Sequence, residues 1–600
     1  MKLSTSRLVI LLLSCLIFGF GIMKGQTAEA SITTSGSTYT VTSGDDLFNL
    51  LTNNKNYWSS QNVPPTDLTI KVANTITLPG YDVSLYSGLT NVKVDFQQHQ
   101  FYAGSYVASR VLIPRTSSAQ LTVANVNNTS NATTNQVTGA PNSAGTGTTT
   151  AYLSTYYGML FSSDFGLSAG TTSCAAQVTY DNVVYNMPNN LVYNQPLCTY
   201  FVPINFTGKN KIVTAVSGQQ VGEIANLKVS SGTTEIIGGD GSSGLAGGMF
   251  YPYYNNLNQA DFPIDVAKGA TLTLTNKDAR APMFAFIGIA NSVTINNQGT
   301  LNLNATSAQT TLFGSGTKGV TLNASAQANT NISTAGAAFS NDMGTTKFIG
   351  NFADQSRTVL SSATSVFKNS SAWKNNSSLN VTAGAKIAAY SGGTQTGGLT
   401  DSSSHYIPVT FNGGSMAQGF LKPSAPSTTD DYTGLEPADS KFNAAGSTVN
   451  SNNLTNANNK GLLISAELLG TDLGAVDQYK WDYNIADLSE QPTLLPRTTG
   501  NDLYFRVIDT RSTTPSFSVM ASYTPAETQP FTMWFKNDQS AVQLSPTDQT
   551  VLSADQMTAD NGVYTKTFDE NAGLLIKASI AARAGSYTGK VVWTLVDGVH

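Results

Sequence analysis

Charged side chains are scarce in this 600-residue chain, at 12% of all residues, whereas an average soluble domain has about 25%. With 32 Lys and Arg against 37 Asp and Glu, the formal net charge is −5. No basic excess is available to bind nucleic acid, which we exclude as a partner. The polarity comes instead from Asn, Thr, Ser and 52 Gly, which disfavours long surface helices and favours turn-rich β structure. Because 40% of the residues are hydrophobic, the chain can bury a sizeable core.

Cysteine and histidine are nearly absent, with three of each. Two of the cysteines, Cys174 and Cys198, lie well beyond the N-terminus, 24 positions apart. On an exported chain one disulfide between them is the simplest prediction, and two buried free thiols are the alternative. Neither cysteine has His or acidic neighbours in sequence, and the three histidines are far apart. We therefore predict no metal site and no cofactor.

Long apolar runs are absent except for Leu8–Met23, which follows Lys2 and Arg7. An A-x-A site ends at Ala30, so residues 1–30 are predicted to be a secretory signal peptide cleaved after that residue. Later apolar runs in the sequence fall well short of the roughly 18 residues that span a bilayer. The sequence therefore predicts an exported chain without a membrane span.

From residue 31 to about residue 420, short segments alternate apolar and polar residues and end in Asn, Gly or Ser. These segments are 68–72, 76–78, 92–96, 227–229, 272–274, 293–295, 301–303, 320–322 and 379–381. A period of two with one apolar face is typical of β-strands. Leu272 and Val293 are 21 positions apart, and Leu301 and Val320 are 19 apart, close to one turn of a β-helix. We predict an all-β chain with a parallel β-helix over residues 31–420; an array of β-sandwiches is the alternative.

Two further features concern the ends of this region. Ser43, followed by Asp45 and Asp46 and then by an apolar run to Leu51, predicts an N-capped helix that covers the first turn of the β-helix. Between residues 421 and 460 the apolar pattern lapses into polar and Pro-containing stretches, which predict a linker. Strand patterning resumes and continues over residues 461–600, which are predicted to be a separate, β-sandwich-like domain.

The last hundred residues contain two conspicuous segments, 503–520 and 584–597. The second contains Trp593-Thr-Leu595, preceded by Gly585 and Tyr587. This arrangement resembles the closing motif of a WxL domain, and segment 503–520 resembles the first half of that domain. The likeness is divergent, because residues 517–519 read Phe-Ser-Val where the first W-x-L is expected and the end of the chain reads Asp-Gly-Val.

The resemblance implies that residues 461–600 hold an exported protein non-covalently to the peptidoglycan of Gram-positive cells. Its candidate wall-binding residues are Phe517, Tyr587, Trp593 and Leu595. In a strand, Trp593 and Leu595 share one face, and packing in the domain core is the other interpretation of that face.

The N-terminal part resembles the pectate-lyase-like adhesive domain that is often fused to WxL domains. The resemblance is carried by the predicted helix near Asp46, the strands over 68–78, and the segments 178–183, 204–208 and 264–274. It implies a right-handed β-helix with an adhesive role.

Tyrosines cluster in the middle of the predicted β-helix, and the candidates for glycan binding are Tyr156, Tyr157, Tyr251, Tyr253 and Tyr254. Exposed Tyr rings stack on sugar rings and bind their hydroxyl groups. The alternative is that these rings fill the core or the turns.

The alternative function is a secreted polysaccharide lyase or glycoside hydrolase that uses the groove of the β-helix. Glycoside hydrolysis needs two carboxylates beside one bond, whereas the acidic pairs at 45–46, 430–431 and 569–570 are predicted to lie in a helix cap, a linker and a turn. We therefore predict no catalytic residues and no enzyme.

The predicted signal peptide indicates a secreted protein, and the resemblance to WxL proteins implies that it belongs to the Gram-positive cell wall and cell surface. Its predicted partners are peptidoglycan and, through the β-helix, host or environmental polysaccharide or other surface proteins. A purely structural stalk is a further hypothesis.

Overall fold

The computed structural model describes residues 32–59, 62–130, 134–153, 158–163, 174–187, 195–214, 221–238, 249–252, 261–277, 282–285, 291–306, 312–314, 317–340, 347–368, 376–393, 396–402, 404–432, 435–466, 469–471, 481–483, 489–499, 503–509, 516–560 and 563–597. The predicted cleavage site at Ala30 lies outside them. The chain divides into two compact units: residues 1–321 with 332–347, and residues 322–331 with 348–600.

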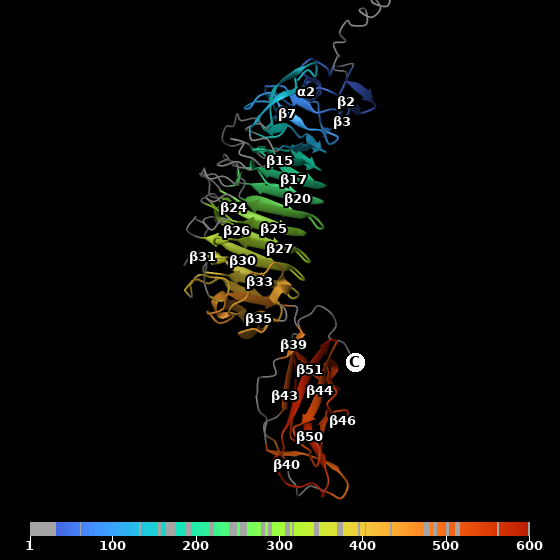
Figure 1. Cartoon of the computed structure of the whole chain (residues 1–600), viewed down its shortest axis with the longest axis vertical. Coiled ribbons are helices and arrows are strands. Elements are labelled where there is room, and N and C mark those ends of the chain that lie inside the picture. The colour runs from blue at the N-terminus through green and yellow to red at the C-terminus, as the bar shows by residue number, and fades with distance from the viewer. Residues whose placement is uncertain are drawn as a thin grey trace, which may run out of the picture. The chain divides into compact units, whose positions relative to one another are not determined.

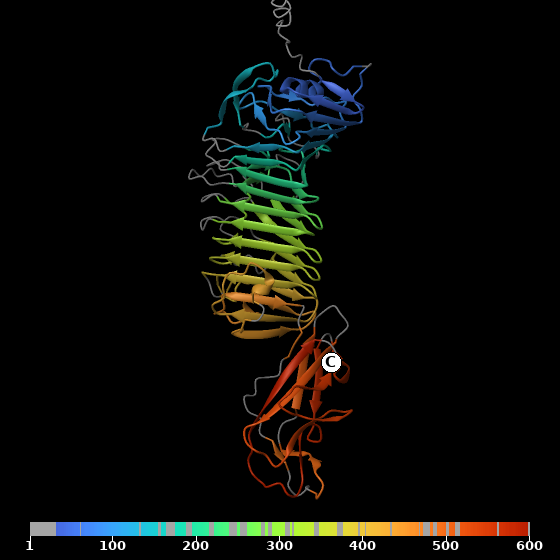
Figure 2. The same cartoon turned by 45° about the vertical axis from the view of Figure 1, so that its right-hand side comes forward.

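Two long stacks of parallel strands form the first unit (Figures 1 and 2). The first sheet runs in the order β2 (Thr38–Val41), β3 (Asp67–Val72), β6 (Asn91–Asp95), β9 (Gln120–Ala124), β14 (Gln177–Asp181), β16 (Ile204–Thr207), β19 (Leu227–Val229), β22 (Asp261–Val266) and β24 (Asn291–Asn297), with β1 (Thr33–Ser35) antiparallel to β2. The second sheet runs in the order β10 (Asn127–Thr129), β15 (Val184–Met187), β17 (Lys209–Thr214), β20 (Thr233–Gly238), β23 (Thr271–Asn276) and β25 (Thr300–Ala305). From β9 onward, each strand of the first sheet is followed in the chain by one of the second.

Shorter strands make several small sheets in the same unit. They are β4 (Ile76–Leu78), β7 (Phe101–Ala103), β11 (Gln136–Pro141) and β12 (Thr148–Tyr152); β5 (Val83–Ser84), β8 (Val111–Ile113) and β13 (Phe161–Ser163); β18 (Gly222–Ile224) and β21 (Phe250–Pro252); and β28 (Phe339–Ser340). Strand β4 pairs parallel with β7, and β18 pairs parallel with β21.

Apolar alternation explains why these residues form strands. In β23, Leu272 and Leu274 are fully buried, while Thr271, Thr273 and Thr275, which alternate with them, face outward and are half-buried. All nine segments predicted as strands fall in strands, and segment 92–96 ends one residue beyond β6. The prediction of an all-β chain is confirmed, and α2 (Gly44–Thr52) is the one α-helix within the described ranges.

Of the six turns that lead from the first sheet to the second between β9 and β25, five contain a residue with positive φ. These residues are Asn125 (φ 53°), Asn182 (φ 56°), Gly208 (φ 67°), Gly232 (φ 73°) and Gly269 (φ 77°). Asn and Gly are the residue types that adopt this left-handed conformation at least cost. The Asn- and Gly-rich composition therefore supplies the turns of the stack.

The predicted helix cap is confirmed. The Oγ atom of Ser43 accepts a hydrogen bond from the backbone N–H of Asp46 at 3.2 Å, at the start of α2. The apolar residues Leu47 and Leu51 of the helix are fully buried. The sequence-local cap and the apolar face together fix α2 against the neighbouring strands.

Buried phenylalanines stack through the interior of the first unit. The ring centroids of Phe250 and Phe284 are 5.4 Å apart, those of Phe284 and Phe313 are 5.5 Å apart, and Phe313 and Phe339 are 6.0 Å apart. All four side chains are at most 1% exposed. The four rings thus form one column in the core of the first unit.

In the second unit, parallel strands are succeeded by antiparallel ones. One sheet contains β29 (Phe348–Phe352), β32 (Ser378–Val381) and β34 (Pro408–Phe411), all parallel, and the antiparallel β37 (Thr448–Asn450). The other contains the parallel pair β30 (Arg357–Ser362) and β33 (Lys386–Ser391), then β38 (Gly461–Ser465), β35 (Ser415–Phe420) and β36 (Asp439–Asn443). The remaining elements are β31 (Phe367–Lys368), η2 (Thr429–Tyr432) and η3 (Ser451–Asn453); β26 (Thr317–Ala324) and β27 (Asn329–Thr334) contain residues of both units.

Residues 421–460 differ from the predicted linker. They contribute β36 and β37 to the sheets, and they bury Tyr432 and Leu454 to 2% and 0% exposure. Strand β38, which begins at the predicted start of the C-terminal domain, pairs with β33 and β35. A few buried residues in a polar stretch are enough to fold it against an existing sheet. The linker prediction is therefore corrected, and these sheets include strands up to Ser465.

The last 130 residues form antiparallel sheets. One contains β39 (Leu469–Thr471), β43 (Leu503–Asp509), β49 (Val563–Phe568) and β48 (Thr558–Asp560); another contains β41 (Thr493–Leu495), β50 (Gly573–Ala578), β45 (Thr532–Lys536) and β46 (Ala541–Gln543); a third contains β47 (Gln549–Ser553), β44 (Phe517–Pro525) and β51 (Gly589–Asp597); β40 (Asp482–Tyr483) pairs with β42 (Arg497–Thr499), and η5 spans Ala554–Gln556. Their shared core includes Phe505, Phe517, Val519, Phe535 and Leu574.

Candidate functional site

The two C-terminal motif segments lie on neighbouring strands. Strands β44 and β51 pair antiparallel with Val519 opposite Leu595 and Ala521 opposite Trp593. Phe517 is fully buried in the core. It therefore cannot touch a cell wall in the folded protein, and the interpretation of this position as core applies.

Trp593 and Leu595 are half-buried and pack against the same core. The Trp593 ring centroid is 4.9 Å from that of Phe505 and 5.9 Å from that of Phe535, both edge-to-face. Such contacts stabilise an aromatic cluster beyond the burial of its area. The alternating apolar face of β51 thus joins the core, with only part of each side chain left to solvent.

Tyr587 is the candidate wall-binding residue with the least contact to that core. Its ring lies edge-to-face with Phe531 at 5.4 Å, and its hydroxyl donates a hydrogen bond to the backbone carbonyl of Arg583 at 3.1 Å. On the opposite face of β51 from Trp593, Val592 is 41% exposed. These two side chains mark the accessible surface near the W-x-L motif.

Of the tyrosines proposed to bind glycan, Tyr156, Tyr157, Tyr253 and Tyr254 lie outside the described residues. Tyr251 is half-buried on β21, where it lies opposite Glu223 of β18.

Glu223 has an unusual environment. Burial raises its pKa from 4.5 to about 7, and a hydrogen bond with the Gln195 side chain lowers it in part. Perturbed carboxyl groups beside aromatic residues are found at functional sites. A second carboxylate nearby would also raise this pKa, because like charges repel. Among the described residues the rise comes from burial, and no other acidic side chain contributes to it. The described part of this site therefore supplies one carboxyl group, where hydrolysis of a glycoside needs two.

The two cysteines correct the disulfide prediction. Both are free thiols, and both are buried. Cys174 Sγ lies 3.7 Å from the backbone carbonyl oxygen of Ser117, while Cys198 is 0% exposed. Burial raises the pKa of both thiols, so each stays protonated and is a poor nucleophile.

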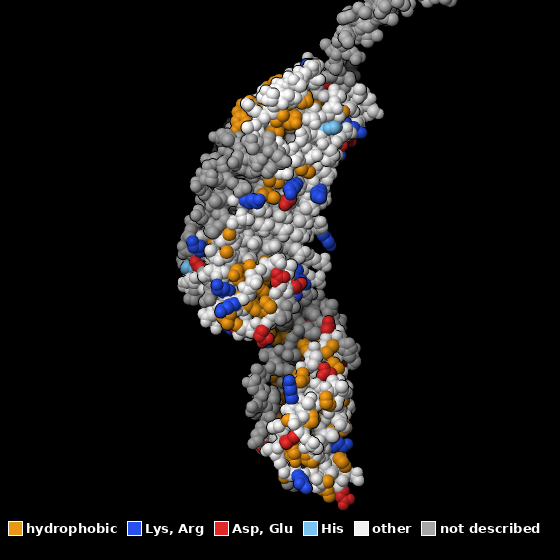
Figure 3. Space-filling view, in the orientation of Figure 1, with side chains coloured by type: hydrophobic (Ala, Val, Ile, Leu, Met, Phe, Trp, Pro, Cys, Tyr) orange, Lys and Arg blue, Asp and Glu red, His pale blue; other side chains and the backbone are white. Residues whose placement is uncertain are grey.

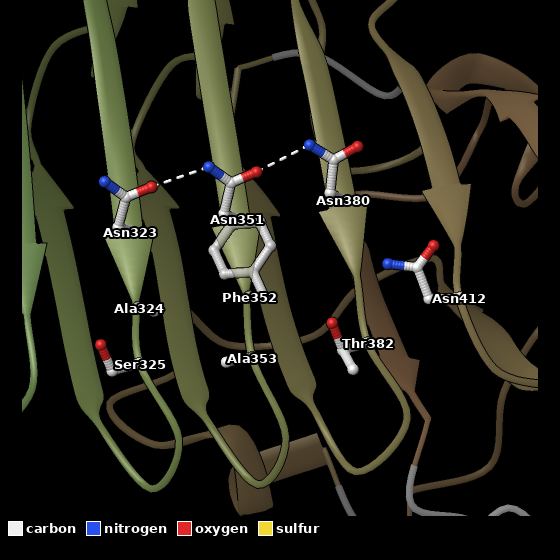
Figure 4. Close-up of a pocket in the computed structure, with 9 residues that line it drawn as sticks. All are labelled: Asn323, Ala324, Ser325, Asn351, Phe352, Ala353, Asn380, Thr382 and Asn412. Carbon is white, nitrogen blue, oxygen red and sulfur yellow. Dashed lines mark hydrogen bonds between the residues drawn. The ribbon is translucent and has the colours of Figure 1, made fainter.

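A shallow groove of about 250 Å³ lies on the second unit and is lined by Asn323, Ala324, Ser325, Asn351, Phe352, Ala353, Asn380, Thr382 and Asn412 (Figure 4). None of these nine described lining residues is charged. The groove is smaller than the roughly 300–1,000 Å³ of sites that enclose a small molecule. It therefore suits one segment of a longer, uncharged ligand.

Three asparagines form a ladder along one side of the groove (Figure 4). The Nδ2 atom of Asn351 donates to Oδ1 of Asn323 at 2.7 Å, and Nδ2 of Asn380 donates to Oδ1 of Asn351 at 2.7 Å. Each amide group has two donor hydrogens and two acceptor lone pairs. The central amide of the ladder thus keeps one N–H and one lone pair with which to bind a hydroxyl group.

A second row of side chains, most of them smaller than the asparagines of the ladder, lines the groove. Ser325, Ala353, Thr382 and Asn412 follow the buried ends of the strands, two residues after the ladder row (Figure 4). Backbone N–H groups of Ala353 and Asn412 donate hydrogen bonds to the carbonyl groups of Ala324 and Val381, which keeps this row in register with the strands. Ser325 and Ala353 leave space that larger residues would fill.

The sequence interpretation missed this site, although a signal was present. Asn stands between two nonpolar residues in Leu322–Ala324, Gly350–Phe352 and Leu379–Val381. These asparagines recur at intervals of 28 and 29 residues. A search for one polar residue at a fixed interval would have found the ladder.

Groups of three or more His, Cys, Asp or Glu side chains placed to hold a metal ion are absent from the part of the chain that the structure describes. Among the helices in that part, none is long and apolar enough to cross a membrane. No family model, curated protein or solved structure matches this chain.

Proposed function

We propose that this chain is an exported cell-surface protein that binds neutral polysaccharide through its stacked strands and attaches to peptidoglycan through its C-terminal β domain. The observation that carries the first part is the uncharged groove with its amide ladder. Preorganised amide groups at the spacing of neighbouring strands, about 4.8 Å, offer repeated hydrogen bonds to the hydroxyl groups of a sugar chain. A polymer also presents many copies of the same unit, so weak sites add up by avidity.

We also propose that the parallel sheets are faces of one right-handed β-helix. The alternation of strands between the first and second sheets, the left-handed turn residues and the stacked phenylalanines support this interpretation. Crossover connections between parallel strands are right-handed in about 98% of cases. A rigid stack of this kind displays a binding face at little entropic cost.

Glycan binding is tested with the full-length protein and soluble neutral polysaccharides, by affinity electrophoresis. Replacement of Asn351 by Ala removes both hydrogen bonds of the ladder and should weaken binding about tenfold, which corresponds to about 1.4 kcal/mol. Asn91→Ala is the matched control, because Asn91 lies on β6, outside the groove, and its Nδ2 atom donates a hydrogen bond to Oδ1 of Asp67 at 2.8 Å. Equal binding by the wild type and N351A would reject the groove as the site.

Wall attachment is tested by sedimentation with purified peptidoglycan. The full-length protein should co-sediment, and a chain ending at Ala466, which keeps β38, should remain soluble. Tyr587→Ala tests the surface near the W-x-L motif, and Tyr504→Ala, at a residue that is 47% exposed, is its control. Co-sedimentation of the truncated chain at the full-length level would contradict attachment through the C-terminal domain.

A polysaccharide lyase or hydrolase is the second candidate function, because Glu223 combines a pKa of about 7 with a neighbouring tyrosine. Incubation with pectin and with neutral glycans, followed by assays for unsaturated products and for reducing ends, tests it. Product formation that Glu223→Gln abolishes would favour the enzyme over the binding protein.

A further inference from the structure

The outward face of the second sheet in the first unit carries a regular array of polar side chains. Strands β23 and β25 pair parallel without a register shift, so that Thr273 lies opposite Asn302. We call this array the Thr/Asn grid, which consists of Thr271, Thr273, Thr275, Thr300, Asn302 and Asn304. All six side chains are half-buried, and the residues between them are buried in the core. The grid is therefore fixed by the backbone ladder and the core beneath it.

The spacing of the grid follows from strand geometry. Neighbouring strands are about 4.8 Å apart, and every second residue of a strand is displaced by roughly 6.6 Å. The Nδ2 atom of Asn302 donates to Oγ1 of Thr273 at 3.0 Å, which holds two adjacent side chains in place. Figure 2 shows the strands of this region stacked with little change of direction. The result is a flat surface with a two-dimensional repeat, quite unlike the groove of the second unit.

Charge is excluded from the grid itself. The nearest charged side chains in register are on β17 and β20, where Lys211 and Glu235 form an ion pair at 3.0 Å. In Figure 3 the surface over β25 carries neither charged nor hydrophobic side chains. Each Thr offers a hydroxyl group and a methyl group, which together match the mixed O–H and C–H surface of a sugar. An uncharged carbohydrate surface fits these groups better than an ionic ligand does.

We propose that the Thr/Asn grid binds the ordered face of an uncharged, insoluble polysaccharide fibre. A flat face contacts a flexible single chain from one side only, and that chain loses conformational freedom on adsorption. A fibre surface is already ordered, so it meets the grid at many points without that cost. This proposal rests on the proposed function, in that it names the class of polysaccharide, but it uses a different set of residues from the amide ladder.

The test is co-sedimentation of the full-length protein with microcrystalline cellulose, crystalline chitin and acid-swollen amorphous cellulose. The wild type should bind at least one crystalline probe more tightly than the amorphous one, and 1 M NaCl should leave that binding unchanged. Thr273→Lys places a long charged side chain at the centre of the grid and should reduce binding at least tenfold. Thr273→Val retains the strand and the side-chain shape without the hydroxyl group, and it should reduce binding severalfold with an unchanged melting curve.

Thr122→Lys is the matched control, since Thr122 is an outward, half-buried residue of β9 in the first sheet. It should bind fibres as the wild type does. Asn351→Ala should also bind fibres normally, so a failure of the groove and a failure of the grid give different results. Wild-type binding by Thr273→Lys, equal binding to amorphous and crystalline probes, or no binding to either crystalline probe overturns the proposal.

Discussion

Replacement of Glu223 by Gln should make the first unit less sensitive to pH. Burial raises the pKa of Glu223 from 4.5 to about 7. One pKa unit corresponds to about 1.36 kcal/mol, so ionising this carboxyl group in the folded protein costs roughly 3 kcal/mol. Gln keeps the shape of the side chain and its hydrogen-bonding capacity toward Gln195 without the charge.

The sign of the effect follows from proton binding. Below pH 4.5 the carboxyl group is protonated in both folded and unfolded chains, so burial costs little. Between pH 4.5 and about 7 the folded protein binds a proton that the unfolded chain lacks, and the free energy of unfolding falls as the pH rises. Above pH 7 the full cost is present. Glu223→Gln should therefore match the wild type at pH 4 and exceed its local stability at pH 8.

Hydrogen exchange is the suitable assay, because a 600-residue chain does not unfold in one step and exchange reports local stability. Peptides that cover β18 and β21 should become better protected in Glu223→Gln at pH 8, after correction for the intrinsic pH dependence of exchange. Glu436→Gln, at an exposed position, should change nothing in these peptides. A gain in protection of the same size at pH 4 and pH 8, or no gain at either, would refute the reasoning.

Three further changes test the fold. Ser43→Ala removes the side-chain cap of α2 and should cost about 1 kcal/mol, seen as faster exchange in that helix; unchanged exchange would contradict the role of the cap. Gly232→Ala should destabilise the first unit by more than 1 kcal/mol in thermal unfolding, because φ is +73° and the added Cβ would lie 2.0 Å from the Gly208 carbonyl oxygen; a melting temperature equal to the wild type's would show that the turn relaxes freely. Arg497→Met removes the guanidinium hydrogen bonds to the carbonyl groups of Phe568, Asp569 and Leu574, although Leu574 keeps one from the Tyr483 hydroxyl. It should lower the stability of the C-terminal domain by about 2 kcal/mol, measured by urea unfolding followed through Trp fluorescence; an unchanged midpoint would contradict this role.

Local patterns were the part of the fold that the sequence predicted well. Alternation of apolar and polar residues located β3, β4 and β23, and a Ser followed by two Asp located the start of α2. These features depend on neighbours within a few residues, because a strand buries every second residue and a helix cap needs an acceptor beside its first N–H groups. Short segments of the sequence are therefore enough to predict them.

Contacts between distant segments were predicted less well. Residues 421–460 look like a linker because few of them are apolar, but Tyr432 and Leu454 are buried against strands formed elsewhere. The disulfide prediction for Cys174 and Cys198 was wrong for the same reason, since the spacing of two cysteines in sequence does not decide whether their sulfur atoms meet.

By itself the sequence determined that the chain is rich in β-strands, low in charge, and supplied with Asn and Gly for left-handed turns. Only the tertiary structure decided which polar residues stand together. Asn323, Asn351 and Asn380 are separated by 28 and 29 residues, and they become a ladder because parallel strands in register place equivalent positions about 4.8 Å apart. The same stacking aligns Thr273 with Asn302. Phe517, in contrast, is buried by the packing of the antiparallel C-terminal sheets against one another.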